Sequence, residues 1–405
     1  MLHTYAIKNF LSFRDRTEVS FKLTPKANTQ GWDTTSPSGQ RLATAMAVIG
    51  PNGAGKTSLL KPLAFVSWFI TNSFRTMAPA AELPIKPHFS SSADPIEVEL
   101  EADDEEGAIW MYVLRAMPNR VLHEAVYKKD KRKYASYSYV FVRDWDEGSQ
   151  QYLIKQQGFD FNPTEAKKVR PNASLISTAA QYGVEVAKRL ASANVATNIS
   201  VKGRLPPEPF TASASKFFYE DNTLRAQMEG LLRSWDLGLS GLEIRKVDLP
   251  LPDNLKVSGG ASSASTFNPF GVHELKDGTR HELPMADESE GTRAAFVKLW
   301  RCLTVLNTGG VAVIDELESA MHPHMLKPLL DLFSSSRTNP HTAQIIFTCH
   351  LTEVLNLLGK SQVMLTEKTD CVSEAWRLDS MTGVRTQDNL YAKYMAGAYG
   401  AVPNL

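Results

Sequence analysis

The sequence predicts an α/β fold with a phosphate-binding loop, an antiparallel β-meander and a helical insertion. Three observations lead to this prediction. A short apolar strand at residues 46–49 enters a glycine-rich turn, and an amphipathic helix follows. Strand-like runs separated by turn residues occupy residues 96–156. Two more short apolar runs, within residues 311–314 and 343–349, each lead into a polar residue.

The turn after the first apolar strand reads GPNGAGKTS, from Gly50 to Ser58, and matches the pattern G-x-x-x-x-G-K-[ST]. Glycine lets successive backbone N–H groups point at a phosphate, and a helix N-terminus adds positive charge. We predict that Lys56 reaches the terminal phosphates and that the Thr57 hydroxyl holds magnesium. An ordinary strand-to-helix turn is the alternative, and the flanking strand and helix favour the phosphate site. The predicted nucleotide-binding residues of this loop are Asn52, Gly53, Gly55, Lys56, Thr57 and Ser58.

Composition limits the class of protein. The 405 residues are 43% hydrophobic, which is globular, and Lys+Arg and Asp+Glu balance at 44 each. A balanced chain has no net positive field for nonspecific nucleic-acid binding. Three cysteines without metal-ligand spacing favour free thiols in a reducing compartment. No apolar run approaches the roughly 20 residues that span a bilayer, and the first residues lack a secretion signal. We expect a cytoplasmic protein without a membrane partner.

The first third of the chain reads mainly as strands. Residues 3–21 alternate well enough for two strands, whereas residues 24–41 are polar and breaker-rich, as in a loop. The helix after the phosphate loop is expected to extend to about Arg75. Alternation in the following runs predicts a sheet with one exposed face. These runs are residues 96–102, 108–116, 121–129, 138–145 and 150–156.

The middle of the chain has a helical pattern. We expect helices within residues 162–201 and 218–238, and a Ser/Gly-rich mobile loop at residues 251–270. No internal repeat or long heptad run is present. The predicted division has three segments: the lobe with the phosphate loop and the meander, a mainly helical insertion, and a second part of the phosphate-binding domain. Their bounds are residues 1–160, 161–265 and 266–405.

A pair of carboxylates follows the apolar strand at residues 311–314. Asp315 and Glu316 stand at its end, where one carboxylate can hold the magnesium shell and the next can polarise a water. Acidic residues in a turn after a strand are common, so the pair alone is ambiguous. Together with the phosphate loop it predicts Asp315 as a metal ligand with Thr57, and Glu316 as the catalytic base.

Two weaker signals flank this carboxylate pair. Ser289 and Gly291 stand where a helix begins, and such a start can bind an anion or simply cap the helix. His350 follows the second apolar run, where a histidine can contact a γ-phosphate or be an ordinary residue at a strand end. Their positions in the chain favour the functional interpretation of both.

Other candidates are weaker still. His322 and His324 are two residues apart and lack a cysteine partner, with His273 and His281 as the remaining donors, so we do not expect a metal site there. The acidic residues in 144–146 resemble a nuclease acid pair but lie between strand-like runs. A hairpin turn explains them better, and we expect no intrinsic nuclease activity.

The order of these motifs resembles the ATP-binding-cassette (ABC) ATPase heads, including those of the SMC and RecF kind. The resemblance implies an ABC-type head, a P-loop NTPase that uses ATP and Mg²⁺. It also implies that Ser289 and Gly291 form the dimer-signature loop, that Glu316 is the catalytic base and that His350 is the switch histidine. Residues 319–322 occupy the position of the D-loop, which lies between the two heads of a pair. Residues 10–14 resemble a start whose basic residue approaches the nucleotide, and the Q-loop candidate is the connection 84–95.

A narrower resemblance rests on four segments: RPNASLISTAAQYG, IDELESAMHP, FTCHLTEVLNL and the ending NLYAKYMAGAYGAVPNL. These segments are similar to stand-alone ATPases of bacterial phage-defence systems, including those of Septu and PARIS systems and the ATPase half of OLD nucleases. The resemblance implies a sensor or regulatory ATPase that forms a homodimer or higher oligomer through its ATP sites. It would control a separate toxin or nuclease effector in response to a phage or nucleic-acid trigger. The alternative is a RecF/SMC-like DNA-binding ATPase of DNA repair, which the balanced charge and the lack of a coiled coil disfavour.

Overall fold

The structure is a computed structural model that describes residues 1–131, 135–235, 238–250 and 263–402. The chain forms two compact units, each built from separate stretches of sequence. Unit 1 comprises Met1–Arg204, Val305–Leu317 and Lys327–Leu405, and unit 2 comprises Leu205–Thr304 and Glu318–Leu326. Within the described residues, no helix is long and apolar enough to cross a membrane.

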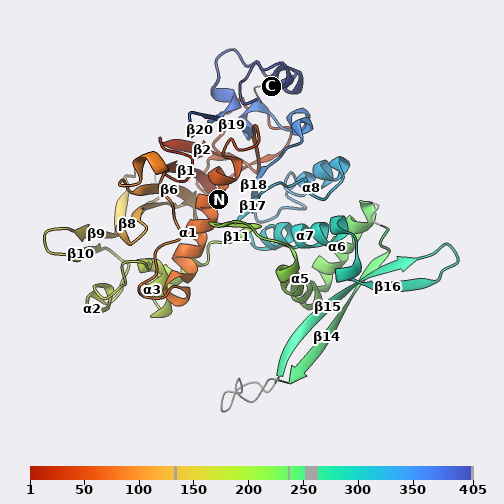
Figure 1. Ribbon diagram of the computed structural model, residues 1–405, viewed down its shortest axis with the longest axis horizontal. Helices are drawn as coiled ribbons and strands as arrows, with labels where there is room; N and C mark the ends of the chain where they lie inside the picture. Colours follow the sequence, from red (N-terminus) through yellow and green to blue (C-terminus); the bar gives the residue numbers. More distant parts are fainter. Residues whose placement is uncertain (132–134, 236–237, 251–262, 403–405) are drawn as a thin grey trace. The chain divides into compact units, whose positions relative to one another are not determined.

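A mostly parallel six-stranded sheet lies at the centre of unit 1 (Figure 1). Its neighbouring strands are parallel except for β19 and β20, which are antiparallel. All five residues of β5 are buried, which is typical of a strand covered on both faces. In sheet order the strands are β11 (Val195–Thr197), β17 (Val311–Ile314), β18 (Gln344–Thr348), β5 (Ala45–Ile49), β19 (Val363–Thr369) and β20 (Val372–Arg377).

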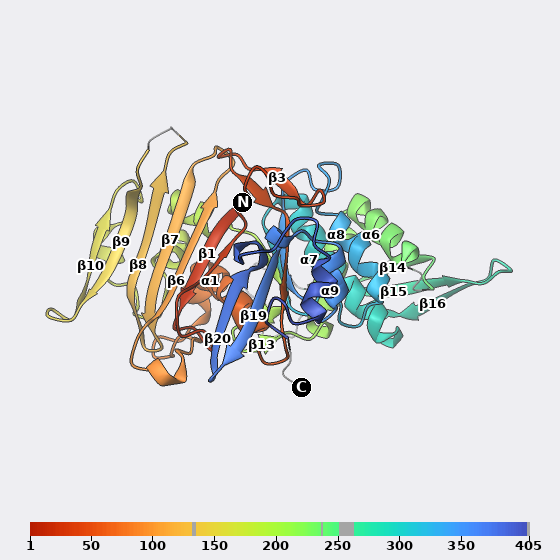
Figure 2. The same ribbon diagram turned by 90° about the horizontal axis from the view of Figure 1, so that it is seen from above.

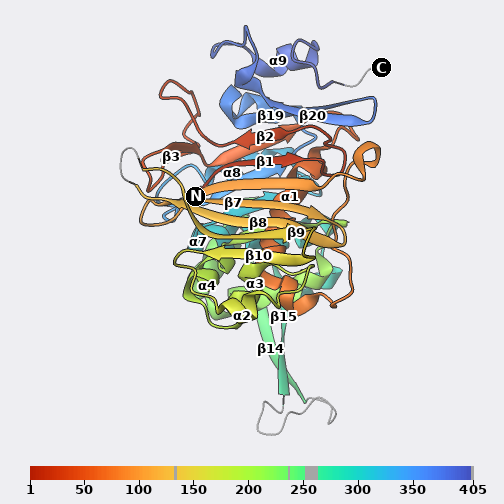
Figure 3. The same ribbon diagram turned by 90° about the vertical axis from the view of Figure 1, so that its left-hand side faces the viewer.

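The second sheet of unit 1 is antiparallel and contains the predicted meander, which is therefore confirmed. Figure 3 shows its seven strands running across the view from β10 to β2. In sheet order they are β10 (Gln151–Gln156), β9 (Ser138–Asp146), β8 (Arg120–Lys129), β7 (Ile109–Met117), β6 (Ile96–Asp103), β1 (Leu2–Lys8) and β2 (Thr17–Ser20). The stretch 24–41, expected to be a loop throughout, contains the short strand β3 (Asp33–Thr35), which pairs with β4 (Arg41–Ala43).

Helix α1 (Lys56–Thr76) supplies the core between the two sheets (Figure 2). Its Phe65 and Phe69 rings stack with centroids 5.5 Å apart and are fully buried. They belong to one apolar cluster that also contains residues of β1, β5 and β6. Burying each ring contributes about 2–3 kcal/mol. The phosphate loop therefore leads directly into a helix that is packed in the core of unit 1. Short helices α2 (Pro163–Ala166), α3 (Leu175–Gln181) and α4 (Glu185–Ala191) cover its far end.

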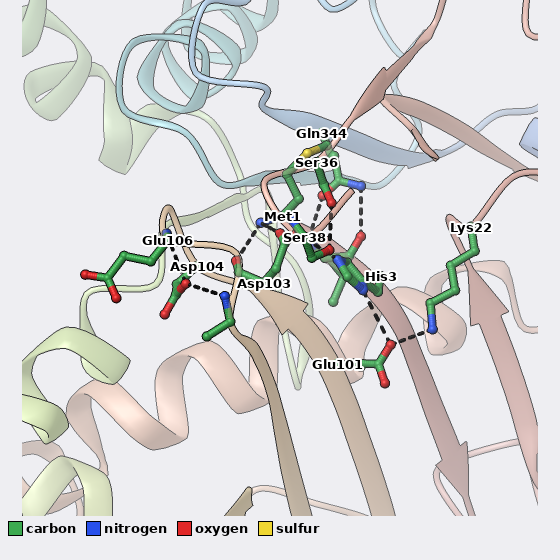
Figure 4. Close-up of polar contacts among 12 residues, drawn as sticks. Met1, His3, Lys22, Ser36, Ser38, Glu101, Asp103, Asp104, Glu106 and Gln344 are labelled. Carbon is green, nitrogen blue, oxygen red and sulfur yellow. Dashed lines mark hydrogen bonds and ion pairs between the residues drawn. The ribbon is translucent and has the colours of Figure 1, made fainter. Parts of the chain in front are cut away.

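Buried polar side chains join the sheets of unit 1 (Figure 4). The Gln344 amide at the start of β18 accepts from Leu2 N–H (2.7 Å) and donates to the Leu2 and Ala43 carbonyls. Next to it, the buried His3 ring lies 3.4 Å from Glu101 Oε1 and 3.2 Å from Asp103 Oδ2. His3, together with Lys22, holds the pKa of Glu101 well below its usual range. The Gln344 bonds fix the start of β18 against β1, whereas the His3 contacts join β1 to β6 within the antiparallel sheet.

In its described residues, unit 2 combines three α-helices with a three-stranded antiparallel sheet. The Phe218 and Phe296 rings, from α5 and α7, meet in its core with centroids 5.5 Å apart. Figure 1 shows the β14–β15 hairpin extending from these helices. The elements are α5 (Thr211–Glu220), α6 (Asn222–Ser234), β14 (Gly241–Pro250), β15 (Ser263–Glu274), β16 (Arg280–Pro284) and α7 (Glu290–Thr308), whose last residues belong to unit 1.

Short elements complete the chain. The α-helices and strands among them are β12 (Ile199–Ser200), β13 (Gly203–Arg204), α8 (Leu326–Asp331) and α9 (Leu390–Met395). The 3₁₀ turns are η1 (Phe89–Ser91), η2 (Glu208–Phe210), η4 (Met285–Asp287), η5 (Pro323–Met325), η6 (Thr352–Asn356), η7 (Lys360–Gln362) and η8 (Leu378–Ser380).

Two local predictions for the middle of the chain are wrong. The helical pattern expected through residues 195–201 is replaced by β11, whose main chain pairs with β17, and by β12, which pairs with β13. Residues 263–270 were expected in a loop and lie in β15, paired with β14. The rest of that expected loop, 251–262, lies outside the described residues. The first break between the compact units lies at 204/205, and the predicted segment bounds 1–160, 161–265 and 266–405 stay a prediction.

Candidate functional site

The phosphate loop has the tight geometry that its glycines predict. A Cβ on Gly50 would lie 2.2 Å from the Thr366 carbonyl oxygen of β19. Gly55 caps α1 with φ +109°, and a Cβ there would lie 2.6 Å from Ser373 Oγ. Side chains are therefore excluded at both positions, by close approach and, at Gly55, by the backbone conformation as well. Neighbouring strands of the parallel sheet thus determine how closely the loop curls.

Lys56 is buried inside this loop although it carries a charge. Its side chain is 6% exposed, and Nζ donates to the Gly50 carbonyl (2.7 Å) and the Pro51 carbonyl (3.0 Å). A buried ammonium requires such acceptors, because desolvation without partners is costly. The loop therefore holds the lysine charge at its centre, where an anion enclosed by the loop would meet it.

A chain of hydroxyl groups ties Asp315 to the loop and to the next strand. Asp315 Oδ1 accepts from Thr57 Oγ1 and from Thr348 Oγ1, each at 2.8 Å. The Glu316 N–H in turn donates to Thr348 Oγ1 (2.7 Å). Parallel strands β17 and β18 end at the same edge of the sheet, which brings these residues together. Sequence reasoning did not identify Thr348, although it stands two residues before His350.

The backbone of Asp315 is held by Asn198, another residue that the sequence did not reveal. Asp315 N–H donates to Asn198 Oδ1 (2.7 Å), and Asn198 Nδ2 donates to the Asp315 carbonyl (2.8 Å). Asn198 directly follows β11, which pairs with β17 in parallel. Its side-chain amide therefore adds one more contact between the two segments, just beyond the paired residues. The alternating β-branched residues of 195–199 were the available sequence signal for this strand.

Glu316 adopts a strained conformation and contacts two basic side chains. Its φ is +50°, a left-handed value that costs a non-glycine residue about 1–2 kcal/mol. Its Oε2 accepts from Arg204 Nη1, and its Oε1 lies 3.6 Å from His350 Nε2. Backbone strain of this kind concentrates at functional sites.

One cavity of about 290 Å³ is lined by the phosphate loop, the carboxylate pair and His350, and its volume is at the lower end for small-ligand sites. It brings together every predicted residue of the loop and the carboxylate pair, as well as His350. Three further lining residues were not predicted: Ser12, Thr348 and Lys368. The full lining is Ser12, Asn52, Gly53, Gly55, Lys56, Thr57, Ser58, Asp315, Glu316, Thr348, His350 and Lys368.

Comparison with known families decides the classification. A family described as "AAA domain, putative AbiEii toxin, Type IV TA system" matches residues 45–356, which is most of the chain. The chain belongs to this family. The predicted α/β fold with a P-loop ATPase core and an antiparallel meander is thereby confirmed for this AAA domain. None of the curated proteins matches the sequence.

Solved SMC heads are similar to this AAA-domain chain at low sequence identity. The SMC head domain from Thermotoga maritima is 12% identical, with 93% of this chain and 98% of that chain covered and a TM-score of 0.41. An SMC head bound to the C-winged helix domain of ScpA is 12% identical, with 95% of this chain and 99% of that chain covered and a TM-score of 0.49. The SMC head with a coiled coil and joint from Pyrococcus yayanosii is 10% identical, with 98% of this chain and 99% of that chain covered and a TM-score of 0.46. With TM-scores below 0.5, the fold assignment rests on the strand order and the family.

The predicted signature residues lie in unit 2 of the AAA-domain chain and do not line the cavity. Ser289 Oγ accepts from the Thr292 N–H (3.1 Å) and so caps the first turn of α7. A Cβ on Gly291 would lie 2.9 Å from the Ala320 carbonyl, so this helix start packs closely on the predicted D-loop. Lys298 also donates to the Ser319 carbonyl. Signature and D-loop positions are therefore neighbours.

Other predicted positions lie away from the cavity. Arg14, the basic residue expected near the nucleotide, pairs with its exposed neighbour Asp15, while Ser12 lines the cavity instead. The Q-loop candidate 84–95 contacts the Asn9 side chain and is not in the lining. The sharp turn at residues 10–13 brings Ser12 to the cavity, and the approach of a basic residue of 10–14 to the nucleotide stays a prediction.

The remaining candidates have structural explanations. Asp144 and Asp146 lie in β9, where Asp144 contacts His123 and Asp146 accepts from the Ser149 N–H of the following turn, so the hairpin interpretation is confirmed. The His322 and His324 rings contact each other edge to face. Within the described ranges, no group of three or more His, Cys, Asp or Glu residues is arranged to hold a metal.

Proposed function

We propose that this protein binds and hydrolyses ATP with Mg²⁺ in the cavity between the phosphate loop and the ends of β17 and β18. The observation that carries the proposal is the convergence of Lys56, Thr57, Asp315, Glu316 and His350 on one cavity. Lys56 supplies a buried cation, and Thr57 and Asp315 together supply two oxygen ligands for a metal. Glu316 supplies a carboxylate base, and His350 is the proposed switch histidine.

The residues present fit a nucleotide and Mg²⁺. No atom of the described residues lies within 4 Å of a Cβ built on Gly53, so a phosphate can approach the loop backbone there. The Thr57 hydroxyl and the Asp315 carboxylate are hard oxygen donors 2.8 Å apart, of the kind that Mg²⁺ prefers. Within the part of the chain that the structure describes, the buried Ser12 hydroxyl on the cavity wall has no hydrogen-bond partner. When bound, Mg²⁺ neutralises phosphate oxygens during phosphoryl transfer.

The chain's own residues then divide the chemistry. Lys56 binds the terminal phosphates, and Thr57 and Asp315 orient the metal. Glu316 Oε1 accepts a proton from the attacking water, a general-base role. His350, whose Nε2 lies 3.6 Å from that oxygen, contacts the γ-phosphate. Asn198 and Thr348 keep Asp315 and Glu316 in place through their backbone groups.

We extend the proposal to a cytoplasmic sensor or regulatory component of an antiphage defence system that controls a separate toxin or nuclease effector. The family description, which names a toxin and a toxin–antitoxin system, supports this role. None of the described residues of unit 2 lines the cavity, and the surface of this unit is the one proposed for partner and assembly contacts. Deleting the gene of this protein and challenging the cells with phages tests this role, since protection should disappear.

The rival function is a DNA-repair ATPase, and hydrolysis assays separate the two. We expect the purified protein to hydrolyse ATP with Mg²⁺ and to stop when a chelator removes the metal. Duplex DNA should leave the rate unchanged, because the net charge is zero. A DNA-stimulated rate that falls steeply with salt would instead favour the repair function.

We propose further that two copies pair through their ATP sites, with Ser289 and Gly291 of each copy covering the ATP of the other. Such a two-fold interface closes with two identical sites. Ser289→Asp tests it, because aspartate still caps α7 but repels a phosphate. Homodimers of Ser289→Asp and of Lys56→Ala should both be inactive. Purified mixed dimers should recover about half of the unmutated rate, since one of two sites is intact. Mixed dimers without any recovery would contradict this arrangement.

A further inference from the structure

A short strap between β11 and unit 2 contacts both carboxylate residues of the site. The strap is residues 198–204, and it contains the two-stranded pair β12–β13. Its first residue, Asn198, holds the Asp315 backbone through both the oxygen and the nitrogen of its side-chain amide. Its last residue, Arg204, donates to the Glu316 side chain. The two ends of the strap therefore contact the two consecutive residues that follow β17.

Arg204 contacts Glu316 from outside the cavity. Glu316 and His350 line the cavity, whereas Arg204 does not. The guanidinium bonds Oε2, and Oε1 remains turned toward His350. The bond to Oε2 thus orients the Glu316 carboxylate, while Oε1 faces the cavity. This is the arrangement expected of a base whose rotamer is fixed by a neighbour.

The ion pair has little value for stability. Arg204 and Glu316 are 39% and 36% exposed, and surface ion pairs of this kind contribute about 0–1 kcal/mol. Orientation is a larger effect, because displacing a reacting group by about 1 Å can lower a rate by about 100-fold. The left-handed backbone of Glu316 increases this sensitivity, since its side chain leaves the strand end at an unusual angle.

We propose that Arg204 is a positioning residue for ATP hydrolysis: it holds Oε2 of Glu316 so that Oε1 faces the attacking water. This inference rests on the proposed function of Glu316 as the base. It assigns to the strap a role in the chemistry, although its residues lie outside the cavity and belong to none of the predicted motifs.

The test compares Arg204→Ala, Arg204→Lys and the control Lys202→Ala, an exposed cation on the same strap. Steady-state hydrolysis is measured in the full chain together with nucleotide affinity and thermal melting. We expect Arg204→Ala to lower kcat about tenfold or more while KM changes less than about twofold, because binding groups are untouched. Arg204→Lys should recover part of the loss, and Lys202→Ala should behave as the unmutated protein.

A double-mutant cycle shows whether Arg204 acts through Glu316. Adding Arg204→Ala to Glu316→Gln should cause no further loss, since the base is already gone. An unchanged or higher kcat for Arg204→Ala overturns the proposal, and so does an equal loss in the Glu316→Gln background. If Arg204→Ala does not fold, Arg204→Gln replaces it, because glutamine keeps an amide donor without the charge. Failure of Glu316→Gln itself to lower the rate would instead refute the proposed base.

Discussion

Glu316→Gln leaves ATP binding intact and lowers kcat by about 10²- to 10⁴-fold, the contribution of a general base. Glutamine has nearly the same shape, and its carbonyl oxygen can still accept from Arg204, so the side chain keeps its place. It cannot accept a proton from water. The backbone bond from residue 316 to Thr348 Oγ1 is also unaffected. Single-turnover hydrolysis and nucleotide retention on the purified protein measure the two properties separately.

The matched control for this change is Glu353→Gln, which neutralises an exposed glutamate on η6, close in sequence to His350. Its rate should equal that of the unmutated protein. Hydrolysis at the unmutated rate by Glu316→Gln would show that another group is the base. A loss of ATP binding together with the rate would show that residue 316 is needed for the shape of the site.

Lys56→Ala should lower ATP affinity by about 100-fold or more. The ammonium is the buried cation of the phosphate loop, and each hydrogen bond to a charged group contributes about 1.5–3 kcal/mol. The substitution also removes the two bonds that Nζ donates to the Gly50 and Pro51 carbonyls. Lys56→Met, which fills the buried space without the charge, should lose affinity to a similar degree. Isothermal titration with a non-hydrolysable ATP analogue measures the change.

Arg75→Ala is the control for Lys56→Ala, because it removes an exposed positive charge at the other end of the same helix. Its affinity for the analogue should match that of the unmutated protein. Thermal melting identifies loss of fold, which would affect both properties at once. A folded Lys56→Ala protein that binds the analogue with unchanged affinity would place the nucleotide outside this loop.

Sequence reasoning identified the site best where the chemistry requires particular residue types in a short segment. The phosphate loop needs glycine where a Cβ cannot fit, and this need is visible as a pattern from Gly50 to Ser58. The strand ending in Asp315 and Glu316 is visible because strands buried on both faces are short and apolar. Helix α1 and the meander follow from periodicity over long runs, which is the most dependable local signal.

Contacts between distant segments could not be predicted in the same way. The roles of Asn198, Arg204 and Lys368 carry no motif, and each residue reaches the site or its carboxylates only because separate stretches of the chain meet there. The pairing of β11 with β17 depends on main-chain register, which overrode the helical pattern assumed for residues 195–201. Residues 263–270 likewise became a strand through pairing with β14.

The amino-acid sequence by itself therefore determined the kind of site this protein has: a phosphate loop, a carboxylate pair after a buried strand, and the α/β class that holds them. These features depend on local sterics and on apolar periodicity, both of which can be read within a dozen or so residues. Only the tertiary structure decided which side chains orient Asp315 and Glu316, and that Ser12 rather than Arg14 faces the cavity. These contacts depend on how strands and turns that are far apart in the chain pack together. The free energy of each contact is determined by both segments, so neither segment predicts it alone.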